Sequence, residues 1–555
     1  VTSREPLRIA GEQEFAVPPL SLPSSSSPRF EDATRSPAVA LFIERAGGVR
    51  ADFTLTEDNV AAVIAICRRL DGLPLAIELA AARIKVLAPH GLLDRLDHSL
   101  KLLSSGRRDA SERQRTLRGA ISWSYDLLSE VEQRLFSRLG VFAGGWSLDA
   151  AEQVCDRGDL DLEVLDGLAS LVDKSLVRAV AGDEERFSML ETIREFATES
   201  LEESGEAQEI RRAHAEYFRG LAEEAEPHLV GENQKEWLDR LERDLGNIRA
   251  ALTWSFLRHI DLATSITAAT RRLWWVRGYL SEGYTWLMKA SVAAPDGSLV
   301  KTKILRGLTA ILQMQGDNKG AERLAHEGLA LSRSLHDEEG TISFLVTLGM
   351  VAEERRDYDR AEASFQEAVE VGQRSGAEAG LAKLVNNLGS IALARNELER
   401  AEQLFNESLE TQMQLGDDET RALTLLNLGL VALKRGSPQA ARPLIIESLA
   451  RSSSLGHKEF IVSNLESLAA IVVSEGRPRD AAQLLGLSQA LQAATGFFLP
   501  ASERQLRRQT LETIQQTVDA ATLSRALQEG EASKLEDLLH RLREDVPATP
   551  STRDC

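Results

Sequence analysis

The chain has 555 residues, too many for a single hydrophobic core, so several domains are expected. Its formal net charge of −20 argues against nonspecific nucleic-acid binding over the whole surface, because an acidic chain repels phosphate backbones. Three cysteines without metal-type spacing and no long apolar run point to a cytoplasmic protein that does not enter the membrane. Leu, Ala, Glu and Arg dominate, and aromatic residues make up only 5%, which favours a mainly α-helical fold.

The first 110 residues indicate a linker followed by helices. Residues 21–28 are rich in Ser and Pro, as linkers are. Helices are expected around Phe42, over Val60–Leu70 and over Leu75–Val86. Pro74 suits the first turn of the last helix, because the amide hydrogen that proline lacks would have no helical partner there.

Residues 111–205 combine three helices with a β-hairpin, the pattern of a winged helix. Ser129 and Glu132 have the spacing of a capping box before an apolar run, and Ser147 can cap the next helix. The expected elements are a helix after Ser129, helices over Leu148–Cys155 and Val164–Val172, and strands over Leu176–Val180 and Arg186–Met189.

The third helix of this block carries the wrong charge for reading DNA. A recognition helix needs Lys or Arg toward the phosphates, but this one carries Glu163 and Asp166, with Asp173 at its end and only Lys174 opposite. Direct contact of this chain with DNA is therefore not expected, and a DNA-binding winged helix with a repeat sensor is the least favoured hypothesis.

Residues 206–300 are predicted to be helical, with aromatic residues that we assign to core packing. Beyond them a 40-residue period runs through residues 301–500. The repeated positions are leucine at 308, 348, 388, 428 and 468, alanine at 321, 361, 401, 441 and 481, and a small residue at 328, 368, 408, 448 and 488. One helix hairpin per period cannot bury its own apolar face, so the hairpins must stack into a solenoid.

This spacing resembles the tetratricopeptide family, whose usual period is about 34 residues. The resemblance implies an inner groove that binds a protein or peptide. Asn387 and Asn427 each precede the repeat leucine, and in related repeats an asparagine there hydrogen-bonds an extended peptide backbone. The alternatives are that both are ordinary exposed polar residues and that the repeats serve only as a spacer.

The N-terminal half resembles the STAND (NB-ARC-like) nucleotide switches of bacterial regulators. The run Gly72–Leu75 (Gly-Leu-Pro-Leu) matches a family motif whose proline packs near adenine, and Thr2–Leu7 is similar to the sensor segment, whose arginine would be Arg4. The run Met189-Leu190-Glu191 is similar to the closing Met-His-Asp motif, with Leu190 and Glu191 in place of the histidine and aspartate.

Together these resemblances imply a mainly α protein with a helical lid, a winged helix and a tetratricopeptide-type α-solenoid. The expected domains are a remnant of a nucleotide-binding core with its linker (1–27), the lid (28–110), the winged helix (111–205), a helical adaptor or degenerate repeat (206–300), the repeats (301–500), a cap of one or two helices (501–545) and a disordered tail (546–555).

The implied function is the sensor half of a signal-transducing switch. No G-x-x-x-x-G-K-[ST] run is present, so this chain alone is expected to be neither an enzyme nor a binder of a cofactor. In a longer parent, ATP or ADP with Mg²⁺ would contact Arg4 and Pro74, the winged helix would act as an intramolecular clamp, and ligand binding would induce oligomers. The alternative is a stand-alone tetratricopeptide scaffold without nucleotide.

Overall fold

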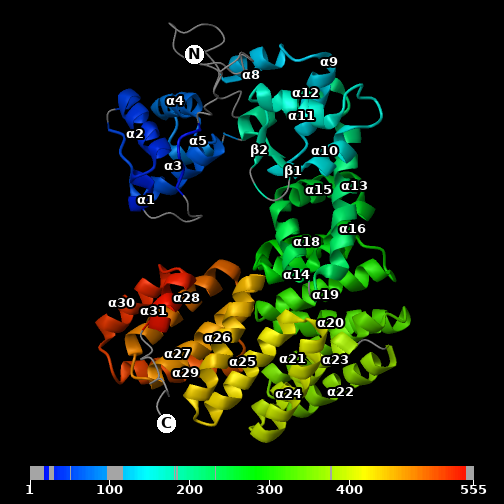
Figure 1. Ribbon diagram of the computed structural model, residues 1–555, viewed down its shortest axis with the longest axis vertical. Coiled ribbons are helices and arrows are strands. Elements are labelled where there is room, and N and C mark those ends of the chain that lie inside the picture. The colour runs from blue at the N-terminus through cyan, green and yellow to red at the C-terminus, as the bar shows by residue number, and fades with distance from the viewer. Residues whose placement is uncertain are drawn as a thin grey trace, which may run out of the picture. The chain divides into compact units, whose positions relative to one another are not determined.

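The computed structural model describes residues 18–23, 30–50, 52–94, 96, 117–180, 182, 185–231, 233–375 and 378–544. The protein is mainly α-helical, as the sequence predicted, with a small sheet near the N-terminal third (Figure 1). The chain divides into two compact units. The first is drawn from residues 1–218 and 243–254, and the second from residues 219–242 and 255–555.

The first unit begins with short helices that correspond to the predicted lid. They are α1 (Phe30–Thr34), α2 (Pro37–Val49), α3 (Glu57–Arg69), α4 (Pro74–Ala82) and α5 (Pro89–Leu93), with a 3₁₀ turn at Arg83–Lys85. Helix α3 starts earlier than predicted, because the amide of Thr56 donates to Asn59 Oδ1 at 2.9 Å and caps its first turn. Helix α4 starts at Pro74, which confirms the predicted place of this proline.

The winged helix follows. Its elements are α8 (Leu117–Tyr125), α9 (Glu130–Leu139), β1 (Gly145–Ser147), α10 (Leu148–Cys155), α11 (Val164–Asp173), β2 (Arg178–Val180), β3 (Arg186–Ser188) and α12 (Glu191–Ser204). The caps at Ser129 and Ser147 are confirmed: their hydroxyls accept from the amides of Glu132 and Ala150 at 3.3 and 3.2 Å. The sheet order is β1-β3-β2, with Trp146 opposite Phe187. The prediction missed β1, which is too short to show an alternating pattern.

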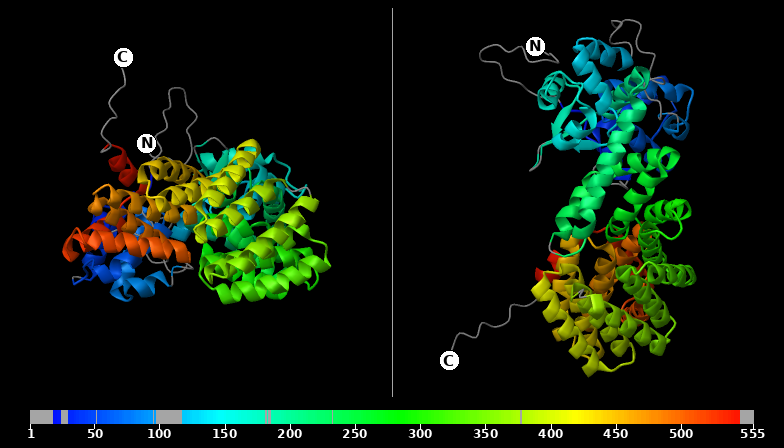
Figure 2. Two further views of the ribbon diagram at one scale, coloured as in Figure 1. Left: turned by 90° about the horizontal axis from the view of Figure 1, so that it is seen from below. Right: turned by 90° about the vertical axis from the view of Figure 1, so that its right-hand side faces the viewer.

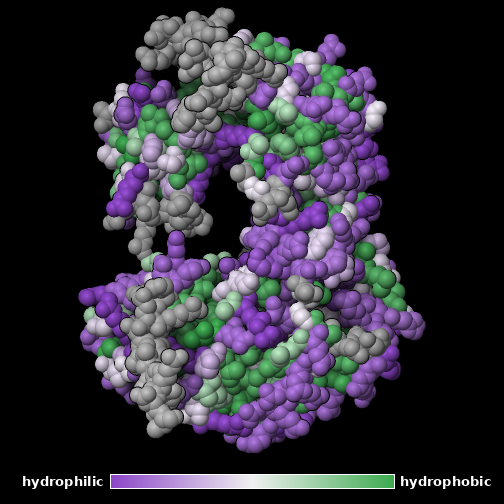
Figure 3. Space-filling model, viewed as in Figure 1, coloured by the Kyte–Doolittle hydropathy of each residue, from purple (hydrophilic) through white to green (hydrophobic). Residues whose placement is uncertain are grey.

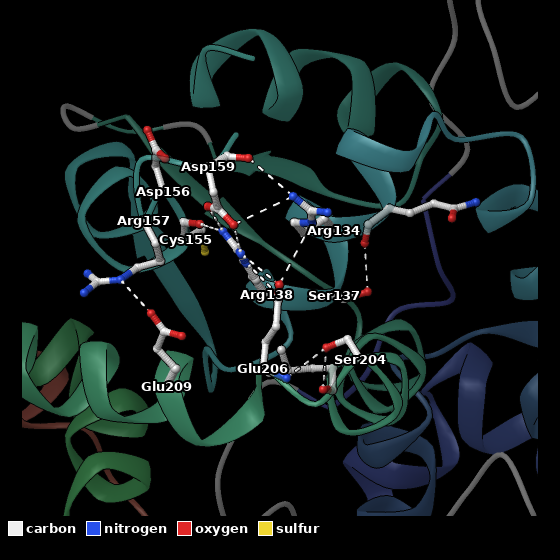
Figure 4. A network of polar contacts seen from close by, with 12 residues as sticks. Arg134, Ser137, Arg138, Cys155, Asp156, Arg157, Asp159, Ser204, Glu206 and Glu209 are labelled. Carbon is white, nitrogen blue, oxygen red and sulfur yellow. Dashed lines mark hydrogen bonds and ion pairs between the residues drawn. The ribbon is translucent and has the colours of Figure 1, made fainter. Parts of the chain in front are cut away.

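One buried guanidinium joins three segments of this unit (Figure 4). Arg138 lies on α9 with a side chain only 3% exposed. It donates to Asp159 Oδ1 and Oδ2 at 2.7 and 2.6 Å, to Glu206 Oε1 and Oε2 at 3.1 and 2.9 Å, and to the Cys155 carbonyl at 2.7 Å. These hydrogen bonds lower the pKa of Asp159 to about 2. The network holds α9 against the segments that follow α10 and α12.

Helices between the winged helix and the repeats span the predicted adaptor, and the division between the two units falls among them. They are α13 (Ala207–Ala225), α14 (Gln234–Arg243), α15 (Leu245–Arg258), α16 (Ile260–Ala269), α17 (Arg271–Val276) and α18 (Leu280–Ala293), with a 3₁₀ turn at Glu226–His228. Trp274 is completely buried, in agreement with the predicted role of these aromatic residues in packing.

Five helix hairpins with a 40-residue period form the solenoid (Figures 1 and 2). The hairpins are α19 (Leu299–Met314) with α20 (Asn318–Ser334), α21 (Glu338–Glu354) with α22 (Tyr358–Ser375), α23 (Glu378–Ala394) with α24 (Leu398–Leu415), α25 (Asp418–Lys434) with α26 (Pro438–Leu455), and α27 (Lys458–Ser474) with α28 (Pro478–Thr495). Contacts between successive hairpins join α19 to α21, α23 to α25 and α25 to α27, whereas successive second helices contact one another much less. The first helices therefore line the inner side of the curve.

The repeated sequence positions pack as predicted. All five repeat alanines are completely buried. Gly349, Gly389 and Gly429 follow the repeat leucine in the first helix, and a Cβ at Gly389 would lie 2.6 Å from the ring of Phe405. Phe365 and Ile445 press equally close on the other two glycines. A small residue here therefore lets the two helices of a hairpin approach each other.

A left-handed backbone position ends the first helix of every repeat. The φ angle is positive at Gly316, Arg356, Asn396, Gly436 and Gly476, which are 40 residues apart. Glycine adopts this conformation without steric cost, whereas arginine and asparagine do so less readily. The period thus places a turn at positions 356 and 396, where the residue type alone would not.

At each of the four junctions between repeats, an ion pair between residues 33 apart ties the end of one first helix to the second helix of the repeat before it. Arg355 pairs with Glu322 at 2.7 Å, Arg395 with Glu362 at 2.5 Å and Arg435 with Glu402 at 2.6 Å. The next pair has reversed charges: Arg442 on the second helix binds Glu475 at 2.7 Å. The surface over α22 and α24 is mainly hydrophilic, as expected where such pairs lie (Figure 3).

Among the described residues that follow the repeats, the chain forms three helices, α29 (Ala501–Gln515), α30 (Ala520–Glu531) and α31 (Leu535–Glu544), where one or two were predicted. The chain turns twice because Asp519 caps α30 by accepting from the amide of Thr522 at 2.9 Å and α31 starts anew at Leu535. Helix α30 packs along α28, and α29 packs along α27. The predicted disordered tail, 546–555, lies outside the described residues.

Candidate functional site

The inner side of the repeats carries a polar residue directly before the repeat leucine in the second, third and fourth repeats. We call Thr347, Asn387 and Asn427 the inner row. All three are largely buried, with exposed fractions of 5%, 8% and 8%. The two asparagines are therefore not the exposed polar residues of the alternative interpretation. A buried amide group is normally hydrogen-bonded, within the protein or to a ligand.

The two asparagines differ in their partners. Asn427 Nδ2 donates to Asn386 Oδ1 at 3.2 Å, so its amide is used inside the protein. Asn387 Nδ2 has no hydrogen-bond partner among the described residues. A buried amide donor without an acceptor costs about 1–3 kcal/mol, and a ligand carbonyl could remove that cost.

Asn386 and its neighbours form a polar chain beneath the inner row. Asn386 Oδ1 also accepts from Thr424 Oγ1 at 3.1 Å, and Thr424 in turn accepts from Gln412 Nε2 at 2.9 Å. Gln412 also donates to Ser408, whose hydroxyl donates to the Ala382 carbonyl at 2.6 Å. This chain fixes the side chain of Asn386, the residue next to Asn387.

A buried carboxylate lies at the start of α25. Glu419 accepts from Gln234 Nε2 and from Arg272 Nη2, both at 2.5 Å. Burial opposes its ionisation, but Arg272 and Lys383 hold its pKa well below the ordinary value. His457 stacks on Phe460 nearby, and burial lowers its pKa to about 4, so its imidazole is neutral at pH 7. Helices α14 and α17 are thereby joined to the start of the fourth repeat.

Of the two residues predicted to contact nucleotide, one can be described. Arg4 lies outside the described residues, whereas Pro74 is exposed at the start of α4. The turn before it is fixed by Gly72, whose φ is +66° and whose carbonyl accepts from the amide of Leu20 at 3.0 Å. Asp71 in the same turn accepts from the amide of Glu191 at 2.7 Å.

The hydrogen bond between Asp71 and Glu191 joins the turn at the Gly-Leu-Pro-Leu run to the run that is similar to the Met-His-Asp motif. Asp71 has a left-handed backbone, with φ 52°, and its carboxylate caps α12, since the N-cap residue Leu190 has no side-chain acceptor. Burial raises the pKa of Asp71 to about 6. Leu190 and Glu191 thus take part in a protein contact that the sequence did not predict, because its partner is 120 residues away.

The third helix of the winged helix exposes acidic and apolar side chains. Glu163, Leu165 and Asp166 on and beside α11 are exposed. Lys174 is engaged, because its Nζ donates to Glu132 Oε1 and Ser170 Oγ, both at 2.8 Å. This face lacks the free basic side chains that bind phosphates.

The part of the chain that the structure describes contains no group of three or more His, Cys, Asp or Glu side chains arranged to hold a metal ion. In the same residues, no helix combines the length and apolar character required to span a membrane.

Two family models match parts of the chain. Residues 128–202 match a winged helix-turn-helix domain, and residues 340–414 match tetratricopeptide repeats. The predicted order of a winged helix followed by tetratricopeptide repeats is confirmed.

Similar proteins occur in mycobacteria. One of Mycobacterium bovis, provisionally named an HTH-type transcriptional regulator, is 42% identical over 290 residues, which are 51% of this chain and 31% of that protein. One of Mycobacterium tuberculosis, described only as uncharacterized, is 40% identical over 226 residues, 39% of this chain and 53% of that protein. The chain thus spans about a third to a half of the length of these relatives.

Solved structures with some likeness include a STAND protein with a tetratricopeptide repeat sensor from Pyrococcus horikoshii. It is 13% identical, with a TM-score of 0.38, over 90% of this chain and 74% of that one. A Rap protein in complex with competence and sporulation factor is 12% identical, with a TM-score of 0.39, over 60% of this chain and 99% of that one. TM-scores this low carry no argument about function.

Proposed function

We propose that this chain is the sensor half of a STAND-type signal-transducing ATPase or transcriptional regulator, and that it binds a partner protein or peptide on the inner side of its repeats. The observation that carries the proposal is the amide of Asn387, which is buried on the inner row without an acceptor in the described protein. The mycobacterial relative named as a regulator supports the regulatory role.

The chemistry of the inner row fits an extended peptide. Every peptide unit of such a ligand offers a carbonyl oxygen, and in an extended chain many of these lack partners. Asn387 Nδ2 would donate to one of them. Asn427 would act indirectly, because its own amide holds Asn386 in position.

In a longer parent, ligand binding at the inner row would control a nucleotide switch. Arg4 and Pro74 would contact ATP or ADP bound with Mg²⁺, and the winged helix would act as an internal clamp in a cytoplasmic protein that oligomerises when its ligand binds. The contact between Asp71 and the amide of Glu191 supports the clamp, because it joins the lid to the winged helix. The chain itself carries no phosphate-binding loop, so we assign it no ATPase activity of its own.

DNA binding by the winged helix is the second candidate, favoured by the family match at residues 128–202. The exposed Glu163 and Asp166 oppose it. Gel-shift titration with random duplex DNA at low salt distinguishes the two: binding that weakens steeply with salt would favour this candidate, because such dependence reports phosphate contacts.

Peptide binding is tested by selecting from a displayed library of random unstructured peptides on the whole chain. Asn387→Ala should weaken binding of a selected peptide about tenfold, since one hydrogen bond to a ligand is worth about 1–1.5 kcal/mol. The matched control is Asn406→Ala, an exposed asparagine on the second helix α24, which should leave the affinity unchanged. Equal affinities for all three chains would refute the role of Asn387.

The nucleotide part of the proposal is tested by calorimetry with ATP and with ADP. We expect binding by a chain extended upstream through the nucleotide-binding core and none by the chain of 555 residues. Substitution of Arg4 or Pro74 in the extended chain should weaken binding. If the extended chain binds neither nucleotide, the scaffold alternative replaces the switch.

A further inference from the structure

Helix α29 covers the inner side of the last repeat. In the second, third and fourth repeats the positions Ser343, Lys383 and Leu423 are partly exposed. The equivalent residue of the fifth repeat, Ser463, is only 3% exposed. Its hydroxyl donates to Glu503 Oε2 on α29 at 2.8 Å, so the surface that is open in earlier repeats is occupied here by the chain itself.

The segment that leads into α29 reaches the first two repeats. The amide of Phe498 donates to the carbonyl of Met314, at the end of α19, at 2.7 Å. Glu354, at the end of α21, accepts from the amide of Ala501 at 2.8 Å and from Arg504 Nη2 at 2.6 Å. Helix α29 and this segment thus bridge repeats that are far apart in the sequence.

The covered surface is acidic, and two arginines of α29 match it. Arg504 binds Glu354 on α21, and Arg507 Nη1 donates to Glu466 Oε1 on α27 at 2.5 Å. Glu466 is completely buried, and its second oxygen has no hydrogen-bond partner among the described residues. A buried carboxylate oxygen without a donor is costly, so this surface can accept more hydrogen bonds than α29 supplies.

One residue of α29 fits the surface badly. Glu503 is close enough to Glu459, Glu466 and Glu354 for their like charges to oppose its ionisation. Burial, together with these like charges, raises the pKa of Glu503 to about 8 although Ser463 donates to it. Helix α29 therefore combines two arginines that match the surface with one carboxyl group that does not. A helix with the two arginines and without that carboxyl group would fit the surface better.

We propose that α29 is a displaceable internal occupant, and that the surface it covers accepts a basic helical segment of a partner protein with two arginines or lysines three positions apart and no acidic residue just before them. The inference rests on the proposed use of the inner side of the repeats for binding. The spacing is that of Arg504 and Arg507, which lie on neighbouring turns of one helix face. Binding of such a segment would release α29 from the first, second and fifth repeats together.

The test uses a fluorescent synthetic peptide with the sequence of residues 499–517 as the probe. The target is the whole chain with Arg504→Glu and Arg507→Glu, which should release its own α29. We expect the probe to bind this variant at least about tenfold more tightly than the wild-type chain, a difference of about 1.4 kcal/mol. A chain with Arg508→Glu is the matched control, because Arg508 is exposed on the same helix, and it should bind the probe as weakly as wild type.

The probe itself provides the second comparison. A peptide with Glu503→Gln should bind the released variant more tightly than the native peptide, and a peptide with both arginines replaced by glutamate should not bind. No binding of the native peptide to the released variant, or equal binding to the variant and to wild type, would overturn the inference.

Should the doubly substituted chain fail to fold, hydrogen exchange on the wild-type chain decides. A displaceable α29 must open without α27 and α28, so its amides should exchange faster than theirs, and Glu503→Gln should slow them. Equal protection of all three helices would show that α29 is a fixed cap. If the probe binds while library selection on the inner row fails, this inference stands and the proposed peptide contact at Asn387 falls.

Discussion

The arginine–carboxylate ion pairs of the winged helix and those at the repeat junctions differ in how deeply the arginine is buried. In the winged helix a single arginine, Arg138, is almost fully buried and joins three segments. In the repeats, arginine and glutamate pair 33 residues apart on partly exposed surface at each junction. A buried charge is costly when its partner is lost, whereas an exposed pair contributes little. Loss of Arg138 alone should therefore destabilise the first unit strongly, whereas loss of any one of these junction pairs should change the stability of the repeats little.

The largest effect is expected from Arg138→Met. This change leaves Asp159 and Glu206 without the buried partner that they share, and loss of one side of a buried pair costs about 3–5 kcal/mol. We expect the lower end, because water reaches both carboxylates. Chemical denaturation measures the loss. Arg134→Met is the control and should change stability little, because Arg134 contacts the same two carboxylates only through longer, exposed ion pairs at 3.7 and 4.0 Å. A small effect at Arg138 would remove the contrast between the units.

Next in size is Gly389→Ala in the third repeat. A Cβ there would lie 2.6 Å from Phe405, and overpacking of this kind costs about 1–3 kcal/mol. Gly220→Ala on α13 is a matched control, since a Cβ there meets nothing within 4 Å, and it should stabilise the helix by about 0.5–1 kcal/mol. Thermal unfolding of the two variants should shift in opposite directions. A shift in the same direction would mean that the close approach of the two helices does not require glycine.

The docking of α29 should depend on pH through Glu503. Its pKa is about 8 when α29 is docked, above the ordinary value of 4.5, so its contribution is fully present below pH 4.5 and is lost as pH rises toward 8. The charged groups that act on it are Glu354, Glu459 and Glu466, and Arg504 and Arg507 lie on the same helix. Exchange of the α29 amides should become at least about tenfold faster relative to α28 between pH 5 and 8, after correction for intrinsic rates, which corresponds to at least about 1.4 kcal/mol. Glu503→Gln should abolish this change, and an unaltered pH profile would contradict the assignment.

The smallest effects are expected at the repeat junctions. Arg395→Glu and Arg442→Glu should each cost up to about 1 kcal/mol, because the pairs are partly exposed. Adding Glu475→Arg to Arg442→Glu should restore stability, since it gives the fourth junction the charge order of the first three. Urea denaturation compares the four chains. No recovery in the double variant would show that the pair contributes through packing and not through charge.

The repeats were the most predictable part, because their pattern occurs five times. Buried alanine at 361 and 401 and glycine at 349 and 389 follow from the period alone. The ion pair between Arg395 and Glu362 was not predicted, because charged residues at helix ends are usually solvated, although arginine and glutamate recur at the equivalent positions of neighbouring repeats. The charged residues of these pairs recur every 40 residues, as the apolar ones do, so the period could have predicted the pairs.

The site was less predictable, because it depends on contacts between distant residues. Asn387 and Asn427 are equivalent in sequence, yet only Asn427 is satisfied, through Asn386 in the neighbouring repeat. Nothing local marks Asp71 as the cap of α12 or α29 as the cover of α27. Such pairings arise from the path of the chain and are not encoded in any single window of sequence.

The account is tested most directly by mapping amide hydrogen exchange of the whole chain with and without a library-selected peptide. It predicts that the peptide slows exchange in the first helices α21, α23 and α25, around Thr347, Asn387 and Asn427, and leaves the second helices and the winged helix unchanged. Slower exchange confined to α11 and the β2–β3 hairpin, or to α22, α24 and α26, would contradict the claim that the inner side of the repeats is the binding surface.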